Sequence, residues 1–282
     1  MESNIKFHCD EDRNFKRPGE LVRAFLYTDY SIAPHTHGFY EINIILSGQG
    51  THHISNASFR VKSGDVFVIP PMTVHAYDET EDLDVFHILL RQKFILEGRE
   101  EALSVPGFLQ LTEIEPFLRS NYSGPRFLHL SGSQLLQLQQ ELKFITEGGI
   151  YNQLELMPMK HHATWKILYW LSYLLSLQLQ SGEVMKNTSH EKAILQVLEY
   201  IHQNYSEKIT IETFCAQTYL SRSTFLRAFQ EICGCSPIRY LQKYRCKKAA
   251  ELLEENKLSK TEIAELCGFY DLSHMMRALK GN

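Results

Sequence analysis

The sequence lacks a hydrophobic run long enough to cross a lipid bilayer. Its longest apolar segment, residues 167–179, contains Tyr, Ser and Gln and falls short of the roughly 20 residues that a spanning helix requires. The first twenty residues mix acidic, basic and polar side chains, so we expect neither a secretory signal nor a membrane anchor there. These absences predict a protein of the cytoplasm with no membrane partner.

Cysteine is sparse and shows no paired framework, which suits a reducing compartment. The six cysteines are Cys9, Cys215, Cys233, Cys235, Cys246 and Cys267. Only Cys233 and Cys235 lie close together in sequence, and no second Cys or His pair follows at the spacing that a zinc site needs. We therefore expect this pair to have a structural role.

Charge is distributed unevenly along the 282 residues, which with 44% apolar residues are enough for about two domains. Residues 185–282 contain 14 Lys and Arg against 11 Asp and Glu, whereas the preceding residues contain 15 against 22. A basic carboxy-terminal region, here called the tail, that follows an acidic amino-terminal region is compatible with nucleic-acid binding by the tail, although its excess of positive charge is small.

Residues 20–95 have the periodicity and composition of short strands. Apolar and β-branched residues at 42–46, 51–54, 59–61 and 66–69 alternate with predicted turns at 47–50 and 62–65, and Pro70 ends the series. Several short strands at regular spacing predict a small barrel or sandwich.

The periodicity becomes helical from about residue 131. One helix is predicted over residues 133–146 and a second, more apolar one over residues 160–180, followed by a polar linker at residues 181–190. Apolar residues on more than one side of the second helix fit either an intramolecular core or the seam of a dimer. Along the two helices these residues are Leu135, Leu138, Leu142, Ile145, Trp165, Leu168, Leu171, Leu175 and Leu179.

The tail contains two short helices joined by a tight turn, at residues 210–217 and 222–231, after a helix at residues 191–204. Ser221 is a candidate N-cap of the second short helix. Arg222, Ser223, Leu226 and Arg227 then face outward together. Such a helix suits the major groove of DNA, where Arg reads guanine edges, although an ordinary helical hairpin with a solvated face has the same pattern.

The same pattern recurs 50 residues later, which favours DNA binding over a plain hairpin. Residues 261–266, a turn at 267–269 and residues 271–280 repeat the unit, so that Arg277 corresponds to Arg227. Residues 237–256 predict a long connecting helix on which Arg245, Lys247 and Lys248 are clustered.

Residues 190–280 closely resemble the AraC/XylS family of bacterial transcription activators. The motifs that match are Ser221-Arg-Ser-Thr-Phe-Leu-Arg-Ala-Phe229, Gly234-Cys-Ser-Pro237, Tyr240-Leu-Gln-Lys-Tyr-Arg245, Ala249-Ala-Glu-Leu-Leu253 and Ile263-Ala-Glu-Leu-Cys-Gly-Phe269. The resemblance implies a homodimer that binds a double-stranded DNA operator and acts on RNA polymerase. It also implies the DNA-binding positions Ser221, Arg222, Ser223, Leu226, Arg227, Leu272, Ser273, Met276 and Arg277.

The chain departs from that family at its end. Family members continue into a further turn and closing helix, whereas this sequence stops after Lys280-Gly-Asn282. Met275 and Leu279 would then lose part of their packing, which predicts a second helix-turn-helix that is marginally stable or stabilised by DNA.

A cluster of His and Glu residues lies in the strand region. His35 and His37 fall on one face of a strand, Glu41 returns to that face, and His75 follows a neighbouring strand. Three imidazoles and one carboxylate suit zinc, iron, manganese or nickel.

This region resembles the cupin fold, through His35-Thr-His37, Glu41 and Gly48 in one motif and Gly64, Asp65, Pro70 and His75 in the next. The resemblance implies a divalent-metal site at His35, His37, Glu41 and His75. The resemblance of the tail to the AraC/XylS family implies the alternative, in which the same residues bind a polar effector such as a sugar. Tyr40 is added to the effector contacts, because an aromatic ring beside hydrogen-bonding groups suits a polyhydroxylated molecule. His52, His53 and His87 are assigned to the surface or to strand faces.

The predicted fold class is α+β: a cupin-like β-barrel with a helical pair, followed by an all-α double helix-turn-helix domain. We expect an effector-sensing barrel at residues 1–128, a helical pair and possible dimerisation region at 129–182, and a DNA-binding domain at 183–282, truncated after its second recognition helix. The predicted function is a ligand-responsive, sequence-specific transcription regulator and not an enzyme. The alternatives are a metal-dependent cupin isomerase or dioxygenase with a helical tail, and an inactive truncated remnant.

Overall fold

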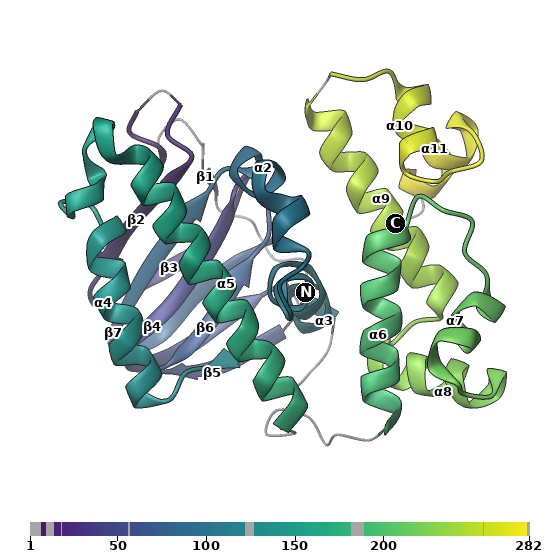
Figure 1. The fold of residues 1–282 in the computed structure, drawn as a ribbon, viewed down its shortest axis with the longest axis horizontal. Helices are drawn as coiled ribbons and strands as arrows, with labels where there is room; N and C mark the ends of the chain where they lie inside the picture. The colour runs from purple at the N-terminus through teal and green to yellow at the C-terminus, as the bar shows by residue number, and fades with distance from the viewer. Residues whose placement is uncertain are drawn as a thin grey trace. The chain divides into compact units, whose positions relative to one another are not determined.

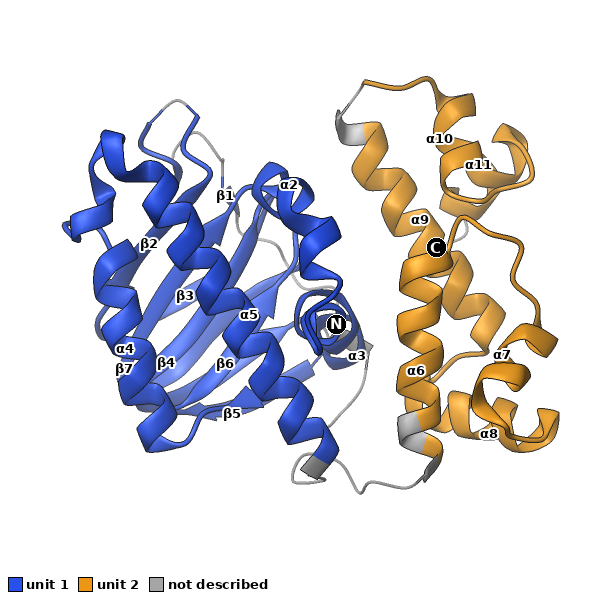
Figure 2. Cartoon of the chain, viewed as in Figure 1, with its two compact units in different colours: residues 1–186 blue, residues 187–282 orange. Residues whose placement is uncertain are grey.

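The computed structural model describes residues 7–9, 14–17, 19–55, 57–121, 127–181, 189–255 and 257–280. The chain divides into two compact units, residues 1–186 and residues 187–282, which Figure 2 shows in different colours. The linker expected at residues 181–190 lies mostly outside the described residues. Each unit has its own buried apolar cluster and is described by itself.

The first unit is built on a mixed sheet of eight strands. In chain order they are β1 (Phe7–Cys9), β2 (Val22–Tyr27), β3 (Ile32–His37), β4 (Tyr40–Ile54), β5 (Ala57–Lys62), β6 (Asp65–Ile69), β7 (His75–Leu90) and β8 (Leu128–His129). Strand β1 runs parallel to β3, whereas the other pairings are antiparallel. Strands were expected between residues 20 and 95, and the structure has them, but β4 and β7 are longer than expected, with 15 and 16 residues.

Two long strands, β4 and β7, organise this sheet. They pair from Tyr40 opposite Leu90 to Ile54 opposite His75, with register shifts between Ile45 and Thr51. At the Tyr40 end, β2 lies beside β7 and β6 beside β4, whereas at the Ile54 end these neighbours are β3 and β5. The register shifts mark irregularities of the bulge type, which bend and twist a sheet. The two ends of the β4 and β7 pair therefore point in different directions and pair with different flanking strands.

Two details of the sequence-based prediction were wrong. The pairing order β1-β3-β7-β4-β6-β8, with β2 and β5 as branches, does not close into a ring among the described strands, so the α+β class is confirmed but a closed barrel is not. The turn expected at residues 47–50 lies inside β4, where Gly48 has a φ of 74° and the register shifts instead of the chain reversing. The other expected turn does join β5 to β6.

Helices cover one face of the sheet, and Figure 1 shows α5 crossing that face beside α4. Leu138 and Leu142 of α4 and Leu171 of α5 pack in one buried cluster with Ile42 of the sheet, so these apolar faces form intramolecular core. None of the described helices is long and apolar enough to cross a membrane. The helical segments of the unit are α2 (Gln92–Ala102), η1 (Gln110–Ile114), α3 (Glu115–Asn121), α4 (Gly132–Ile145), η2 (Ile150–Asn152), η3 (Leu154–Leu156) and α5 (Met157–Ser181).

The regular elements among the described residues of the second unit are all helices. Its helices are α6 (Ser189–Asn204), α7 (Ile211–Thr218), α8 (Arg222–Cys233), α9 (Pro237–Glu255), α10 (Lys260–Leu266) and α11 (Leu272–Lys280). These bounds agree with the periodicity of the tail to within a few residues. Cys233 and Cys235 are buried free thiols, and Gly234 between them ends α8 with a φ of 58°.

We predict that Gly48→Ala strongly destabilises the first unit. A Cβ atom at this position would lie 2.2 Å from the backbone oxygen of Asp82, and the positive φ disfavours a side chain in any case. We expect the free energy of unfolding to fall by about 1–3 kcal/mol, measured by urea titration followed by circular dichroism. Gly132→Ala is the matched control, because nothing lies within 4 Å of a Cβ there. Equal effects of the two substitutions would contradict this account of β4.

Candidate functional site

A buried carboxylate surrounded by imidazoles lies in the first unit. Oε2 of Glu41, in β4, is 2.9 Å from Nε2 of His37 and 3.1 Å from Nε2 of His75. Nδ1–H of His87 donates to Oε1 of Glu41 at 2.6 Å. These four side chains are buried and come from β3, β4 and β7, three strands that lie side by side in the sheet.

Backbone carbonyl oxygens orient three of the imidazoles. Nδ1 of His35, His37 and His75 donates to a carbonyl oxygen two residues away, at 3.0, 2.8 and 3.1 Å respectively. Because a carbonyl oxygen only accepts, each Nδ1 carries a proton. Ligand atoms of His35, Glu41 and His75 all lie within 4.8 Å of one another.

The cluster keeps its carboxylate ionised. Burial by itself would raise the pKa of Glu41, but hydrogen bonds from His37, His75 and His87 outweigh it and hold this pKa well below its ordinary value. Burial and the neighbouring His75 together lower the pKa of His35 to about 4. At neutral pH the site therefore contains a negative charge beside a neutral imidazole.

The structure brings together four of the five residues that the sequence proposed as effector contacts. His35, His37, Glu41 and His75 share the site, whereas Tyr40 lies in the core beneath the helices. The reason is the alternation of a strand: neighbouring side chains point to opposite faces, so Tyr40 and Glu41 cannot face the same site.

Sequence reasoning missed His87 and His52 as interior residues. His87 was assigned to the surface or a strand face, but it is buried and bonded to Glu41. Its position inside the apolar run Val85-Phe-His-Ile-Leu-Leu90 was a usable signal, because a lone imidazole in a buried strand needs a partner. His52 is also buried, whereas His53 is half-exposed and bonded to Asp78 at 2.7 Å.

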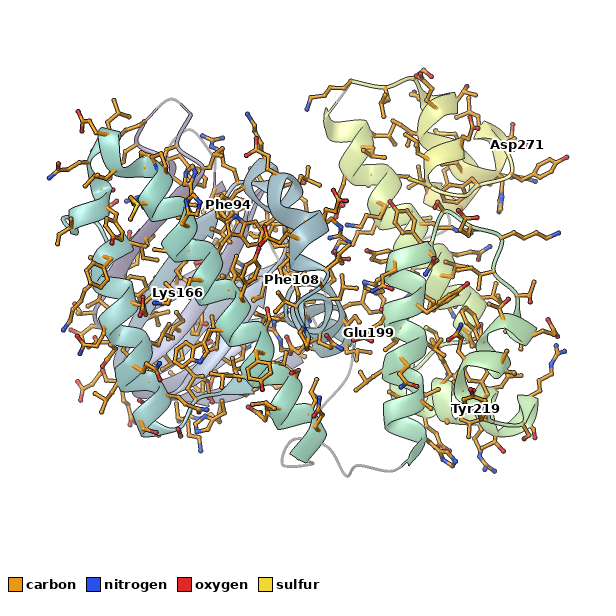
Figure 3. All side chains as sticks on the ribbon, viewed as in Figure 1. Phe94, Phe108, Lys166, Glu199, Tyr219 and Asp271 are labelled. Atoms are coloured by element: carbon orange, nitrogen blue, oxygen red, sulfur yellow. The ribbon has the colours of Figure 1, made fainter. Side chains whose placement is uncertain are left out.

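The first helix-turn-helix of the second unit consists of α7 and α8. Tyr219 makes the turn in the left-handed region with a φ of 55°, and its side chain, labelled in Figure 3, is 97% exposed. Ser221 caps α8 by accepting a hydrogen bond from the backbone N–H of Thr224, as the sequence predicts. Phe225 and Phe229 are fully buried, which fixes the opposite face of α8 outward.

That outward face carries the expected residues. Arg222, Ser223 and Arg227 are exposed and Leu226 is half-buried. The Arg222 guanidinium pairs with Glu212 of α7 at 2.8 Å across an exposed surface. Arg227 forms no ion pair with any described residue.

The second helix-turn-helix consists of α10 and α11 and is capped in a similar way. The carboxylate of Asp271, labelled in Figure 3, accepts a hydrogen bond from the backbone N–H of His274 at 2.6 Å. Ser273 and Arg277 are exposed, and Leu272 and Met276 are half-buried. Met275 is fully buried, so the loss of packing expected for it is absent, while Leu279 is half-buried.

Arg245, from the basic cluster expected on α9, is half-buried and bonded within the unit. Arg245 donates from Nε to the carbonyl oxygen of Tyr205 and from Nη2 to that of Glu207, both at 2.7 Å. Gly268, in the turn of the second helix-turn-helix, lies so close that a Cβ would be 2.6 Å from the oxygen of Ser206. Arg245 therefore holds the segment after α6 against the second helix-turn-helix.

Comparison with known proteins matches both units. Residues 17–150 match the family described as AraC-like ligand binding domain, and residues 214–281 match a helix-turn-helix domain family. The HTH-type transcriptional activator RhaS of Salmonella schwarzengrund is 27% identical over 242 residues, which cover 85% of this chain and 80% of the relative. RhaS of Pectobacterium carotovorum is 26% identical over 244 residues, with the same coverage.

Solved structures are also similar in part. The DNA-binding domain of AdpA, a global transcriptional factor crystallised with a target DNA, is 29% identical and covers 32% of this chain and 81% of that chain, with a TM-score of 0.31. ToxT from Vibrio cholerae O395 is 14% identical and covers 93% of this chain and 95% of that chain, with a TM-score of 0.36.

We predict that Glu41→Gln destabilises the first unit in a pH-dependent way. A depressed folded pKa gives stability that is complete above the ordinary Glu value of 4.5 and is lost as the pH falls through the folded pKa. We expect a loss of about 1–3 kcal/mol at pH 7, and a smaller difference from the wild type as the pH falls below 4.5. Urea titrations across this pH range measure both quantities.

Glu79→Gln is the control for that experiment, because Glu79 is a largely exposed carboxylate paired with Arg60. Its loss should change the free energy of unfolding by less than about 1 kcal/mol. A Glu41 variant as stable as the wild type at pH 7, or one whose deficit grows in acid, would show that the imidazoles do not stabilise the ionised carboxylate.

Proposed function

Because the chain belongs to the AraC family of transcription regulators, we propose that it binds an operator in double-stranded DNA under the control of a small molecule held in its first unit. The chain is accordingly a ligand-responsive regulator and not the metal-dependent isomerase or dioxygenase that the cupin resemblance allowed. Since its target would be bacterial DNA, we place it in the cytoplasm.

The proposal for DNA recognition rests on α8. A helix that is capped by Ser221, follows a tight turn and exposes Arg222 and Arg227 has the chemistry of a recognition helix. Arginine forms bidentate hydrogen bonds to guanine in the major groove. Helix α11, with exposed Ser273 and Arg277, supplies a second such surface. We propose that the two helices read separate segments of one operator.

We propose a sugar or a related catabolite as the effector. The ionised Glu41 and the imidazoles around it present acceptors and donors that match hydroxyl groups. An effector that binds one arrangement of the regulator better than another shifts the population toward that arrangement, which would change the DNA-bound state.

A homodimer and activation through RNA polymerase complete the proposal. Leu136 of α4 and Tyr173 and Leu177 of α5 are large apolar side chains that remain exposed. A second copy of the chain would bury such residues, as the sequence-based alternative of a dimer seam requires. We propose activation because the relatives are named transcriptional activators.

We predict that Arg227→Ala weakens specific DNA binding. The probe is a duplex that the wild-type chain selects from a random pool at low salt. Loss of an arginine that reads a base should lower affinity about 10- to 100-fold, measured by fluorescence anisotropy at fixed salt. Arg222→Ala should cost less, because this side chain must first leave Glu212.

Lys93→Ala is the matched control, since it removes one exposed positive charge from the first unit. It should leave the affinity for the selected duplex unchanged. The DNA-binding proposal is wrong if the wild type enriches no duplex, or if both arginine variants bind the enriched duplex as tightly as the wild type does.

We propose, as a second function of the same cluster, that it binds a divalent metal ion. The Nε2 atoms of His37 and His75 both lie within 3.1 Å of the same oxygen of Glu41, and their Nδ1–H groups donate hydrogen bonds to backbone carbonyl oxygens. In these hydrogen bonds a proton lies between each Nε2 atom and the carboxylate oxygen, and a metal cation bound by the same three atoms would take the place of those protons. Imidazoles held by such outer hydrogen bonds are typical of metal ligands.

The donor set of His35, His37, Glu41 and His75 suits zinc, manganese, iron or nickel. We predict that the purified chain contains one of these metals, and that dialysis against EDTA lowers the melting temperature by about 5 °C or more, reversibly. Elemental analysis should show less metal in His75→Ala and wild-type content in His53→Ala, whose imidazole bonds Ser58 and Asp78 elsewhere. A wild type that contains no metal and responds to none of the four would exclude this site.

A further inference from the structure

Each helix-turn-helix of the second unit has a tyrosine in the turn before its outward helix. Tyr219 lies two residues before Ser221, the N-cap of α8, and Tyr270 lies one residue before Asp271, which caps α11. Their side chains are 97% and 92% exposed, the highest values among the large apolar and aromatic side chains of the described residues. The two most exposed of these side chains therefore occupy corresponding turns of a repeated motif.

The backbone conformation of Tyr219 disfavours a side chain. Tyr219 ends α7 in the left-handed region, with a φ of 55° and a ψ of 20°, and its N–H donates to the carbonyl oxygen of Cys215. Glycine is the usual residue at such a helix end, because a Cβ atom disfavours this conformation. Gly234 after α8 and Gly268 after α10 adopt the same conformation, with φ of 58° and 72°. At Tyr219 a bulky side chain stands where the same unit elsewhere uses glycine.

The fold gains little from either tyrosine side chain. At such high exposure the two rings contribute almost nothing to packing. Neither hydroxyl forms a hydrogen bond with any residue that the structure describes. Residues held in an unfavourable conformation are concentrated at functional sites, where the side chain is needed for something other than stability. A ring that strains the turn at Tyr219 and adds no contact within the chain therefore indicates a contact with another molecule.

We propose that Tyr219 and Tyr270 contact the phosphate backbone of the operator, each at the edge of the groove segment that the following helix enters. The inference rests on the proposed function, and it adds two contacts to those of the outward faces of α8 and α11. Both residues directly precede the capped start of a helix. When the first turn of that helix reaches the base edges, the residues before it lie at the level of the sugar-phosphate backbone.

The chemistry of tyrosine suits a phosphate group. Phosphate oxygens only accept hydrogen bonds, and a phenol hydroxyl donates one. Tyrosine is among the side chains that bond phosphates in protein–DNA complexes and thereby fix the position of the protein on the duplex. The backbone N–H groups at the start of a helix favour the same anion.

The two contacts differ in strength because the two helix caps differ in charge. Helix α8 is capped by the neutral hydroxyl of Ser221, which leaves the start of the helix favourable for an anion. Helix α11 is capped by the carboxylate of Asp271, which repels a phosphate placed beside Tyr270. We therefore expect Tyr219 to contribute more to DNA affinity than Tyr270 does.

Tyr219→Gly in the full chain tests whether this side chain acts outside the fold. Glycine relieves the left-handed backbone, so the melting temperature should rise by about 1–3 °C, measured by differential scanning calorimetry. Affinity for the selected duplex should fall about 5- to 20-fold, measured by fluorescence anisotropy at fixed salt. Tyr270→Gly is the control for stability, because Tyr270 has no positive φ and glycine there should bring no rise. A melting temperature of Tyr219→Gly below the wild type would show a structural role and overturn the proposal.

Tyr219→Phe and Tyr270→Phe test the hydroxyl groups alone. Binding of the selected duplex should weaken about 5- to 20-fold in the first variant and about two- to fivefold in the second. Because tyrosine carries no charge, the slope of affinity against salt concentration should stay that of the wild type. Tyr200→Phe is the matched control, since it removes the hydroxyl of a half-buried tyrosine in α6 of the same unit, and it should bind as the wild type does. Full affinity in both turn variants would overturn the proposal.

A second duplex of unrelated sequence separates a phosphate contact from other contacts. Loss of a phosphate contact should weaken both duplexes by the same factor, whereas a loss confined to the selected duplex would indicate a base contact and overturn the assignment. Full DNA affinity with weaker transcription from a promoter that carries the selected site would indicate a protein partner and overturn it as well. A wild type that selects no duplex would contradict both this inference and the proposed function, whereas unaffected phenylalanine variants would contradict this inference alone.

Discussion

The first unit depends on one buried charge, the carboxylate of Glu41. A carboxylate taken out of water is strongly destabilising unless hydrogen bonds replace its hydration, and here three imidazoles do so. Those imidazoles come from positions up to 46 residues away in the sequence. The carboxylate can remain ionised only if β3, β4 and β7 keep their register, so the chemistry of the site and the pairing of the strands depend on each other.

The long ladder of β4 and β7 makes this arrangement possible. Because the register shifts near Gly48, the two strands face one set of neighbours near Glu41 and another near His75. Residues from both regions are thereby brought to the same inner face, including Asn43 and His52, which share Tyr77 as a neighbour. An interior lined with so many polar groups is a poor hydrophobic core but a suitable place for a polar guest, and the apolar core lies instead between the sheet and the helices.

The second unit differs from the first, because its turns and helix caps depend on hydrogen bonds between residues close together in sequence. Its turns and helix starts are specified by residues near one another in sequence, such as Ser221 with Thr224 and Asp271 with His274. Hydrogen bonds between distant residues decide the relative placement of the two helix-turn-helix motifs. Arg245 and Gly268, both close to the segment after α6, provide this placement. Arg245 was expected in a basic cluster on the surface of α9, but it donates hydrogen bonds to carbonyl oxygens within the unit.

The sequence by itself determined a strand-rich region followed by helices α4 to α11, the Ser221 cap, the outward face of α8 and the gathering of His35, His37, Glu41 and His75. Each depends on periodicity, on a local hydrogen bond or on a motif within one stretch of chain. Only the tertiary structure decided that the sheet stays open, that Tyr40 faces away from Glu41 across the strand, and that His52 and His87 are interior. These outcomes depend on strand register and on contacts between residues far apart in sequence, and no local pattern specifies which distant strand will supply the partner.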